Sequence, residues 1–386
     1  MQYDFLVIGG GINGAGIARD AAGRGLKTLL VEQGDLAGAT SSASTKLIHG
    51  GLRYLEYGEF RLVRKALQER AVLQRIAPHI VTPLRFIMPT PARGRPRWLI
   101  RLGLFLYDHL ADRGGLPGSS GASLAGKWGD GLKDRARGGF IYSDCWVDDA
   151  RLVVLNALSA HEKGADIRVR TRFVAAEPAD GGWHATLLDV ASGTTRTVRA
   201  RAIINAAGPW VDSIVNRMPA VTPDRPVRLV KGSHVVVRRR FDGPHAYIFQ
   251  NDDGRIMFAI PYERDFTLVG TTDIAQDGDP ANPQISVEEI DYLCREANRF
   301  LADEIAPKDI VYSFSGVRPL YDDGADNASA VTRDYVLRLG ADGLPPVMSI
   351  YGGKITTYRK LAEHVLEQMA PVMGFAARGW SDSEPL

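Results

Sequence analysis

Cysteine is scarce in this 386-residue chain. Cys145 and Cys294 are its two cysteines, far apart and outside any C-x-x-C spacing, which argues against a disulfide framework, a dithiol redox centre and a metal site. An excess of charge of one sign is also lacking: the formal net charge is +2, so charge gives no reason to expect a nucleic-acid partner. Without repeats or low-complexity segments, the chain has the length expected of a two-domain globular protein.

The sequence also lacks a secretory signal and a hydrophobic run that could span a bilayer. The first expected strand starts within about four residues of the N-terminus, which predicts a cytoplasmic protein. In the segment 98–111, nine of fourteen residues are large and apolar, but Arg101 and Asp108 interrupt them. This run falls far short of the roughly 20 residues that a transmembrane helix needs.

What the sequence does contain is a glycine motif near the N-terminus. An apolar run, residues 5–8, leads into Gly9, Gly11 and Gly14, and a helical stretch and a second apolar strand follow, ending at Glu32. These glycines permit a tight turn, close approach of a pyrophosphate and close packing of helix on strand. Glu32 is placed to accept hydrogen bonds from a ribose and would repel a 2′-phosphate. The unit predicts a Rossmann-like α/β domain that binds a dinucleotide other than NADP.

Two later segments favour FAD over NAD. The strand through residues 202–212 ends in small residues around Gly208, where the chain can pass beneath a dinucleotide. A second strand-to-helix junction contains Gly353, Lys354 and Thr356, and a helix N-terminus there would stabilise the negative edge of a reduced flavin. An NAD enzyme needs no such C-terminal contact, so two half-sites at opposite ends of the chain indicate the longer FAD.

A loop rich in hydroxyl groups follows the second strand. We expect its side chains to donate hydrogen bonds to the pyrophosphate, because the loop lies directly after that strand and before "HGGLRY". The alternative is a flexible loop without a ligand. The residues concerned are Thr40, Ser41, Ser42 and Ser44.

The remaining patterns predict a discontinuous α/β architecture. A Rossmann-like FAD-binding domain is assigned to residues 1–80, 140–215 and 345–386, and a second, β-rich, mixed-sheet domain for substrate and membrane to residues 81–139 and 216–344. Apolar periodicity places the main elements. We expect helices at 59–77, 148–163 and 287–303, strands at 183–190 and 195–208, and a β-rich section at 225–275.

Taken in order, the motifs resemble those of the flavin-dependent, aerobic-type glycerol-3-phosphate dehydrogenases. The first is common to many FAD oxidoreductases, whereas the later ones are specific. The resemblance implies FAD, oxidation of sn-glycerol 3-phosphate to dihydroxyacetone phosphate, and a membrane quinone as acceptor. It rests on "GGGINGAGIARDAAGRGL", "TSSASTKLIHGGLRYLE", "YSDCWVDDARLV", "NAAGPWV", "KGSH", "IPYERDFTLVGTTD", "SGVRPL", "TRDY" and "GGKITTYRKLAEH".

One departure from this family concerns the C-terminal end. Its members continue into a further helical domain, whereas this sequence stops at Leu386, where that domain would begin, so either the sequence is truncated or the protein is a shortened form. The core motifs are present, so the chemistry is expected to be retained. A homodimer is one expectation that this departure weakens.

Such a reaction needs cations for a dianionic phosphate and a base for the C2 hydroxyl. Arginine makes bidentate contacts to phosphate, and the candidates are Arg53, Arg318 and Arg333. Lys354 would polarise the flavin or the substrate oxygen, and Tyr54 would donate to the substrate.

Histidine is the expected base, because a neutral imidazole is available near pH 7. His49 lies in the loop expected beside the flavin, and His234 lies in "KGSH" at the entry to a strand. The sequence leaves the choice between them open. It also leaves open an oxygen-using glycerol-3-phosphate oxidase, an FAD-dependent amine or amino-acid oxidase, and a flavin-binding sensor without turnover.

The segment 93–113 is the predicted membrane contact. Basic flanks beside aromatic residues are typical of a helix lying in the interface of an anionic membrane, here the inner face of the cytoplasmic membrane. A buried core helix is the alternative, and replacing Leu104 and Phe105 by Ser is expected to separate the two. The residues that suggest the interface are Arg93, Arg95, Arg97, Trp98, Phe105, Tyr107 and Arg113.

Overall fold

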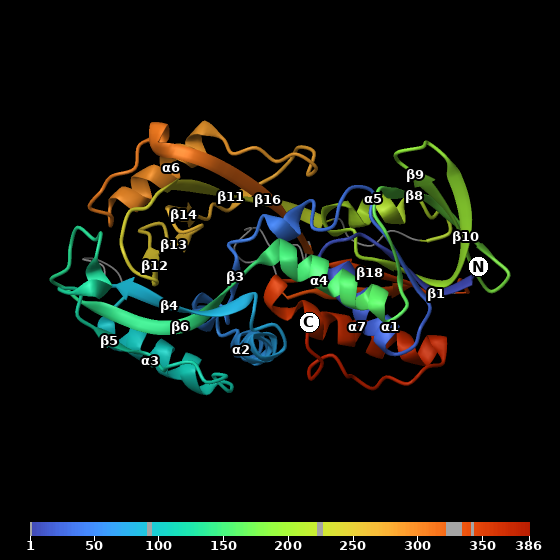
Figure 1. The fold of residues 1–386 in the computed structure, drawn as a ribbon, viewed down its shortest axis with the longest axis horizontal. Coiled ribbons are helices and arrows are strands. Elements are labelled where there is room, and N and C mark those ends of the chain that lie inside the picture. The colour runs from blue at the N-terminus through green and yellow to red at the C-terminus, as the bar shows by residue number, and fades with distance from the viewer. Residues whose placement is uncertain (1, 91–94, 222–226, 322–333, 341–342) are drawn as a thin grey trace.

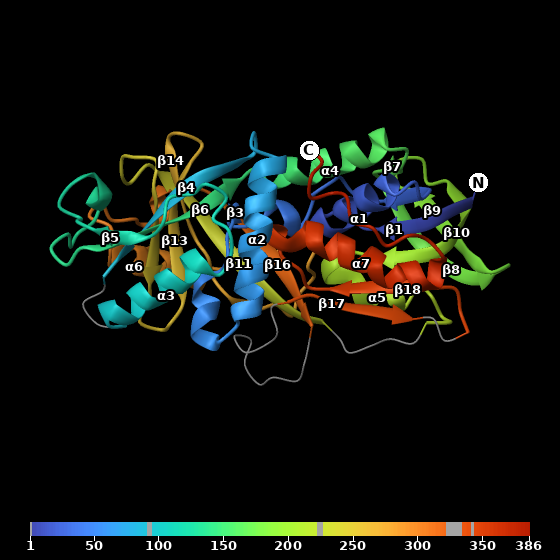
Figure 2. The ribbon, with the colours of Figure 1, turned by 90° about the horizontal axis from the view of Figure 1, so that it is seen from below.

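The computed structural model describes residues 2–90, 95–221, 227–321, 334–340 and 343–386. Two mixed sheets lie side by side along the long axis, and helices cover them (Figure 1). Seen from below, helix α2 (Phe60–Ile76) runs across the junction between the two sheets (Figure 2). This confirms the predicted α/β class, with a Rossmann-like part and a β-rich part.

The first sheet contains the N-terminal βαβ unit. Strand β1 (Gln2–Ile8) pairs in parallel with β2 (Thr28–Val31) and β10 (Thr195–Asn205), and α1 (Ile12–Gly23) connects β1 to β2. The apolar run of β1 is buried on both faces, as parallel strands require. The strand order is β17 (Val336–Gly340), β18 (Val347–Tyr351), β10, β1, β2 and β7 (Asp166–Arg168), with β8 (Thr171–Ala179) and β9 (Gly182–Asp189) extending it from β10.

Helices and short turns complete this part. Helices α4 (Asp149–Glu162) and α7 (Tyr358–Met373) pack against α1, as the view in Figure 1 shows. The predicted helices at 59–77 and 148–163 are confirmed by α2 and α4. A short helix, α5 (Val211–Val215), follows β10.

The second sheet is mostly antiparallel. Its one described parallel pair joins β12 (Ala246–Gln250) to β4 (Val81–Pro89). Helix α6 (Val287–Asn298) packs on β11 (Val227–Arg238), β13 (Ile256–Tyr262) and β14 (Phe266–Gly270). It ends five residues before the predicted boundary at 303. The strand order is β15 (Ile274–Ala275), β11 (Val227–Arg238), β14 (Phe266–Gly270), β13 (Ile256–Tyr262), β12 (Ala246–Gln250), β4 (Val81–Pro89), β6 (Gly139–Val147) and β3 (Leu47–Ile48), with β16 (Ile310–Tyr321) on β11 and β5 (Ser120–Ala122) on β6.

The strand pairing departs from the predicted domain boundaries. Strands β3 and β6 belong to the second sheet, although their residues were assigned to the FAD-binding domain, and β17 belongs to the first sheet. The physical reason is that β6 is buried along almost its whole length. A strand buried on both faces has the same apolar pattern in either sheet, so the sequence did not show which sheet it joins.

Helix α3 (Arg97–His109) corrects part of the membrane prediction. Leu104 is 0% exposed and Tyr107 is buried, so both face the protein, whereas Trp98 is 68% and Phe105 49% exposed. The helix therefore buries one apolar face in the protein and turns a second row of apolar residues to solvent. No helix in the described part of the chain has the length and hydropathy that a bilayer span requires.

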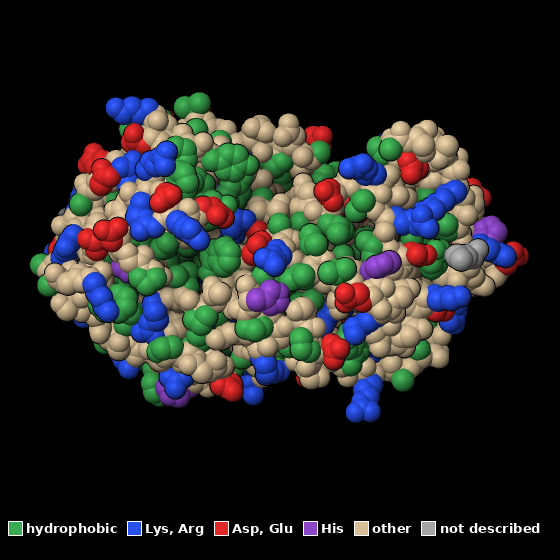
Figure 3. Space-filling view, viewed as in Figure 1, with side chains coloured by type: hydrophobic (Ala, Val, Ile, Leu, Met, Phe, Trp, Pro, Cys, Tyr) green, Lys and Arg blue, Asp and Glu red, His purple; other side chains and the backbone are tan. Residues whose placement is uncertain are grey.

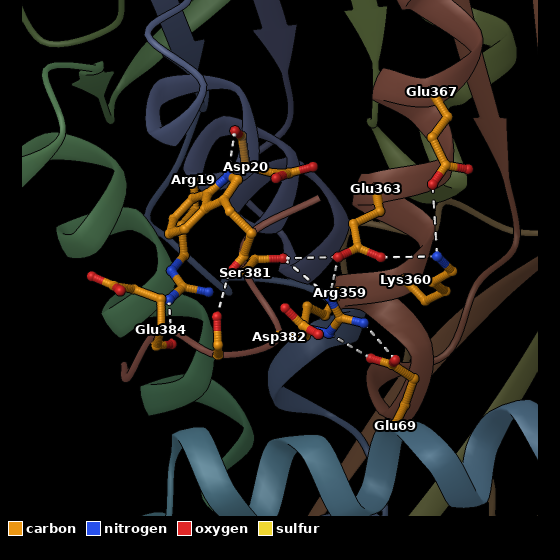
Figure 4. Close-up of polar contacts among 12 residues, drawn as sticks. Arg19, Asp20, Glu69, Arg359, Lys360, Glu363, Glu367, Ser381, Asp382 and Glu384 are labelled. Atoms are coloured by element: carbon orange, nitrogen blue, oxygen red, sulfur yellow. Dashed lines mark hydrogen bonds and ion pairs between the residues drawn. The ribbon is translucent and has the colours of Figure 1, made fainter. Parts of the chain in front are cut away.

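The C-terminal segment that follows α7 packs against helix α1 of the first sheet. The Trp380 indole donates to the Asp20 carbonyl of α1 across 3.1 Å, and the Arg19 guanidinium lies 5.1 Å over its ring. Figure 4 shows Arg359 of α7 lying between Glu69 of α2 and Glu363 of α7. These buried ion pairs fix α2, and with it the cavity that α2 lines, against α7.

Candidate active site

A cavity of about 1090 Å³ is lined by residues of both sheets. It brings together most of the side chains singled out in the sequence, although these come from every part of the chain. Of the described residues among them, Gly14 and Ser42 lie outside the lining, and Arg333 lies outside the described residues. The lining includes Gly9, Gly11, Glu32, Thr40, Ser41, Ser44, His49, Arg53, Tyr54, Gly208, His234, Arg318, Gly353, Lys354 and Thr356.

The glycine motif forms a close turn at one end of the cavity. Gly9 has φ +112°, and a Cβ there would lie 2.6 Å from the Ala206 carbonyl oxygen at the end of the neighbouring strand. A Cβ on Gly14 would lie 1.9 Å from the Gly9 oxygen, so Gly14 acts through packing and not through the ligand. Helix α1 starts at Ile12, and its N-cap, Gly11, has no side chain to bond the first amides. Apart from the Ile12 amide, which donates to Ser41, these amides are left for an anion.

Glu32 stabilises this turn directly. Its carboxylate accepts hydrogen bonds from the amides of Gly10, at 2.7 Å, and Gly34, at 2.8 Å. An ionised carboxylate offers about four lone-pair positions. Two positions therefore remain for the ribose hydroxyls expected from the sequence.

Three hydroxyls of the hydroxyl-rich loop donate within the protein, and their role at the pyrophosphate stays a prediction. Thr40 donates to the Val317 carbonyl at 2.7 Å, Ser42 to the Ala39 carbonyl and Ser44 to Asp149. The proton of each hydroxyl is thus used within the protein. Ser41 instead accepts the Ile12 amide at the start of α1, at 2.9 Å, and keeps its proton for another acceptor.

The C-terminal junction closes the cavity from the other side. Gly352 and Gly353 have φ of +76° and +102°, and the Asn13 amide of α1 donates to the Gly352 carbonyl. The Asn13 Oδ1 atom is buried and has no hydrogen-bond partner among the described residues. Lys354 lies with its Nζ 3.9 Å over the Tyr54 ring. The two predicted half-sites therefore meet, although they are far apart in sequence.

In the motif "KGSH" of strand β11, successive residues face opposite sides of the sheet. The side chains of Lys231 and Ser233 bond to the buried carboxylate of Glu289 on α6, while Gly232 and His234 face the cavity. The His234 ring needs a glycine opposite it, since a Cβ on Gly270 would lie 2.2 Å away. The segment is thus fixed at Lys231 by its ion pair with Glu289 and at His234 by packing against Gly270.

The two histidines differ in their electrostatic surroundings. Burial, with Arg318 and Lys46 nearby, lowers the pKa of His234 to about 3, and its Nε2 lies 3.0 Å from Thr45 Oγ1. Burial also lowers the pKa of His49, but the Asp144 carboxylate opposes this shift. Both imidazoles are neutral at pH 7.

Cationic side chains face the same space. Arg318 pairs with Asp273 at 3.0 Å, and Gly232 leaves room for its guanidinium because a Cβ there would lie 2.7 Å from Nη2. Arg53 donates to the Tyr57 hydroxyl at 3.0 Å. On the outer surface, in contrast, positive and negative side chains are interspersed (Figure 3).

Sequence reasoning missed several lining residues. Thr45 bonds to His234, Asp273 pairs with Arg318, and Tyr142 and Phe258 add aromatic walls. Thr45 and Asp273 lie inside motifs that were recognised, "TSSASTK" and "VGTTD", so the signal was present without a role attached to it.

Comparison with known proteins agrees with this geometry. The sequence profile described as FAD dependent oxidoreductase matches residues 4–359. The chain belongs to this FAD-dependent oxidoreductase family. FAD is therefore its cofactor, and the glycine turn, Ser41, Asn13 and the C-terminal junction are the residues here that fit it.

Individual relatives are similar over almost the whole chain. D-erythritol 1-phosphate dehydrogenase of Brucella abortus is 54% identical, with 99% of this chain and 76% of that protein covered. Glycerol-3-phosphate dehydrogenase of Pseudomonas aeruginosa is 54% identical, with 100% and 75% covered. The structure of the Bacillus halodurans glycerol-3-phosphate dehydrogenase with FAD superposes with TM-score 0.74 at 32% identity, covering 99% of this chain and 67% of that one.

Proposed function

We propose that this flavoenzyme oxidises sn-glycerol 3-phosphate to dihydroxyacetone phosphate and passes the electrons to a membrane quinone. The observation that carries the proposal is the convergence of His49, Arg318 and Lys354 on the cavity formed by the glycine turn. The similarity to the Pseudomonas aeruginosa enzyme supports the substrate. Bound FAD supplies the hydride acceptor, its N5 atom.

His49 is the proposed base for the C2 hydroxyl. A base must hold enough affinity for the proton that it receives, and a histidine with a pKa of about 3, such as His234, is poorly suited. The Asp144 carboxylate raises the proton affinity of His49 against the effect of burial. His234 is left to orient the substrate beside Thr45.

The cations of the cavity are proposed to hold the phosphate. Arg318 offers a planar donor set, and Arg53 and Lys354 add positive charge beside Tyr54, which would donate to the substrate. Arg333 is proposed for the same task from the "TRDY" motif alone. Together they would select a phosphorylated polyol over an amino acid.

A second substrate deserves the same test. The Brucella abortus relative, named for D-erythritol 1-phosphate, is as similar to this chain as the Pseudomonas aeruginosa one. Both substrates are polyol phosphates and differ by one hydroxymethylene group. The same base and the same cations would serve either substrate. The two proposals therefore differ only in the length of the substrate's carbon chain.

Anaerobic mixing of the oxidised protein with each substrate tests the proposal. Flavin absorbance should bleach with sn-glycerol 3-phosphate and stay unchanged with D-amino acids or sarcosine. Faster bleaching by D-erythritol 1-phosphate would favour the second substrate, and bleaching by none would favour a sensor without turnover. Reoxidation by oxygen as fast as by quinone would make the protein an oxidase.

Peripheral attachment to the inner face of the cytoplasmic membrane is proposed through α3. Its outer face exposes Trp98, Leu99, Leu102 and Phe105, an apolar stripe at helical spacing. Such a helix lies in the interface, with nearby arginines on anionic headgroups. A quinone dissolved in the bilayer would then be close to the enzyme.

Liposome sedimentation tests this attachment, with variants chosen from the exposed face. Trp98→Ser with Phe105→Ser should abolish sedimentation with anionic liposomes and leave flavin content unchanged. Val287→Ser with Leu158→Ser, which changes two exposed apolar residues on α6 and α4, is the control and should sediment normally. Leu104 is unsuitable because it is in the core. Unchanged sedimentation of the α3 variant would refute the proposal.

A further inference from the structure

The residue after His49 is held by a buried chain of hydrogen bonds that the reaction above does not use. The Gly50 amide donates to the Tyr107 hydroxyl across 2.7 Å. The Tyr107 hydroxyl lies 2.8 Å from both oxygens of the Asp144 carboxylate, to which it donates. Arg70 completes the chain, with its Nη1 2.6 Å from Asp144 Oδ1. All four residues of this hydrogen-bonded series are buried. They come from the loop of His49, from α3, from β6 and from α2.

The chemistry of the groups fixes the direction of each bond. A carboxylate paired with Arg70 only accepts, so the Tyr107 proton points to Asp144 and a lone pair faces the Gly50 amide. Burial raises the pKa of Tyr107 well above its usual value, so the hydroxyl keeps this proton. A rotation of the peptide at Gly50 would leave a buried N–H without a partner.

Packing restricts the same peptide. A Cβ on Gly50 would lie 2.5 Å from Leu67 Cδ2 and 2.7 Å from the Tyr107 hydroxyl. On the N-terminal side of the His49 side chain, the backbone amide of His49 donates to Thr356 Oγ1 at 3.3 Å. The backbone amides of His49 and Gly50 are thus both held, on either side of the point where the His49 side chain leaves the backbone.

We infer that Tyr107 and Asp144 are positioning residues for His49: they hold the His49–Gly50 peptide so that the imidazole keeps its direction into the cavity. The inference rests on the proposed function, in which His49 accepts the substrate proton. Tyr107 lies on α3, whose outer face is the proposed membrane contact. One hydroxyl therefore joins that helix to the loop carrying the base.

Tyr107→Phe tests the inference because it removes the hydroxyl and keeps the ring in its core. The rate constant for anaerobic flavin reduction by sn-glycerol 3-phosphate should fall at least tenfold, while the substrate Kd changes less than about threefold. Tyr247→Phe is the matched control: that tyrosine is also buried, and its hydroxyl bonds only to the carbonyls of Trp128 and Asp130 among the described residues. The control should stay within threefold of wild type.

A double-mutant cycle separates positioning from general loss of structure. In a His49→Ala background, Tyr107→Phe should change the reduction rate less than twofold, because the side chain that it positions is gone. A tenfold loss in both backgrounds would overturn the inference. So would an unchanged rate in the Tyr107→Phe single variant.

Asp144→Asn gives a second measurement that keeps the Tyr107 hydroxyl. Three charged groups act on His49, namely Asp144 from β6, Arg70 from α2 and Lys354 before α7. Loss of the Asp144 charge should move the acidic limb of the reduction rate to lower pH, and an unmoved limb would show that the Asp144 carboxylate does not act on His49. Loss of flavin from both the Tyr107 and Asp144 variants would show a purely structural role. Failure of sn-glycerol 3-phosphate to bleach wild type would instead refute the proposed function.

Discussion

Arg318→Ala should weaken binding of sn-glycerol 3-phosphate by a predictable amount. A hydrogen bond to a charged group contributes about 1.5–3 kcal/mol. The Arg318 side chain is 35% exposed and already shares its charge with Asp273. Solvent screening and this pairing place the loss at the lower end, about 1.5–2 kcal/mol, or on the order of 10- to 30-fold in Kd.

The assay is anaerobic flavin reduction at increasing substrate concentration, which gives Kd and the reduction rate separately. Glycerol, which has no phosphate, serves as the internal control, and its weak binding should be the same in wild type and Arg318→Ala. Asp273→Asn tests the pairing from the other side. Removing this carboxylate should tighten phosphate binding by up to about fivefold, since a partly exposed ion pair is worth about 0.2–1 kcal/mol.

The reasoning would be refuted by either of two results. A Kd for sn-glycerol 3-phosphate within threefold of wild type would place Arg318 outside the phosphate site. An equal loss for glycerol and its phosphate would show that Arg318 shapes the cavity and does not recognise charge. Weaker binding in Asp273→Asn would show that Asp273 orients Arg318 more than it neutralises it.

Two further predictions concern the framework of the site. Gly14→Ala should destabilise the fold by about 1–3 kcal/mol and lose flavin on gel filtration, because the new Cβ meets the glycine turn, whereas Gly103→Ala, with open space around it, should keep flavin. Arg359→Met should cost about 3–5 kcal/mol at pH 7 by leaving Glu69 and Glu363 buried without their shared cation. In wild type, burial raises the pKa of Glu363 but Arg359 and Lys360 lower it more, so its stabilisation exists above the unfolded pKa and is lost as the pH falls through the folded pKa. Burial raises the pKa of Glu69 even in wild type. Without Arg359 burial is less opposed and the folded pKa values of Glu69 and Glu363 rise, so urea unfolding should show stability increasing from pH 7 to pH 5. A flat profile would contradict this.

The sequence was most informative where a residue type has one physical use. Gly9, Gly11 and Gly14 require close backbone approach, and an apolar strand, a helix and an acid follow in register, so both the fold and the dinucleotide could be predicted. The second half-site at Gly353 and Lys354 was found because glycines at a strand-to-helix junction have the same meaning. The structure brings both into one cavity.

Hydroxyl groups were harder to predict because they have many possible partners. Thr40, Ser42 and Ser44 could each donate to a phosphate, to a backbone carbonyl or to a carboxylate, and only the fold shows which acceptor is near. Helix α3 was ambiguous for a related reason. Leu104 and Phe105 are neighbours in sequence, yet one is in the core and the other in solvent, because successive residues on a helix point about 100° apart.

The motif "YSDCWVDDARLV" shows how three acids of one stretch acquire different roles. Asp144 accepts from Arg70 and Tyr107, Asp148 caps helix α4 through the Arg151 amide, and Asp149 binds Lys46 of the hydroxyl-rich loop. Asp144 lies on strand β6 and Asp149 begins helix α4, so their carboxylates point in different directions. Each therefore reaches partners that lie far from it in the sequence. None of these three acids lines the cavity, although Tyr142 of the same motif does. The use of the motif is to fix the two loops, around His49 and around Ser44, that do line the cavity.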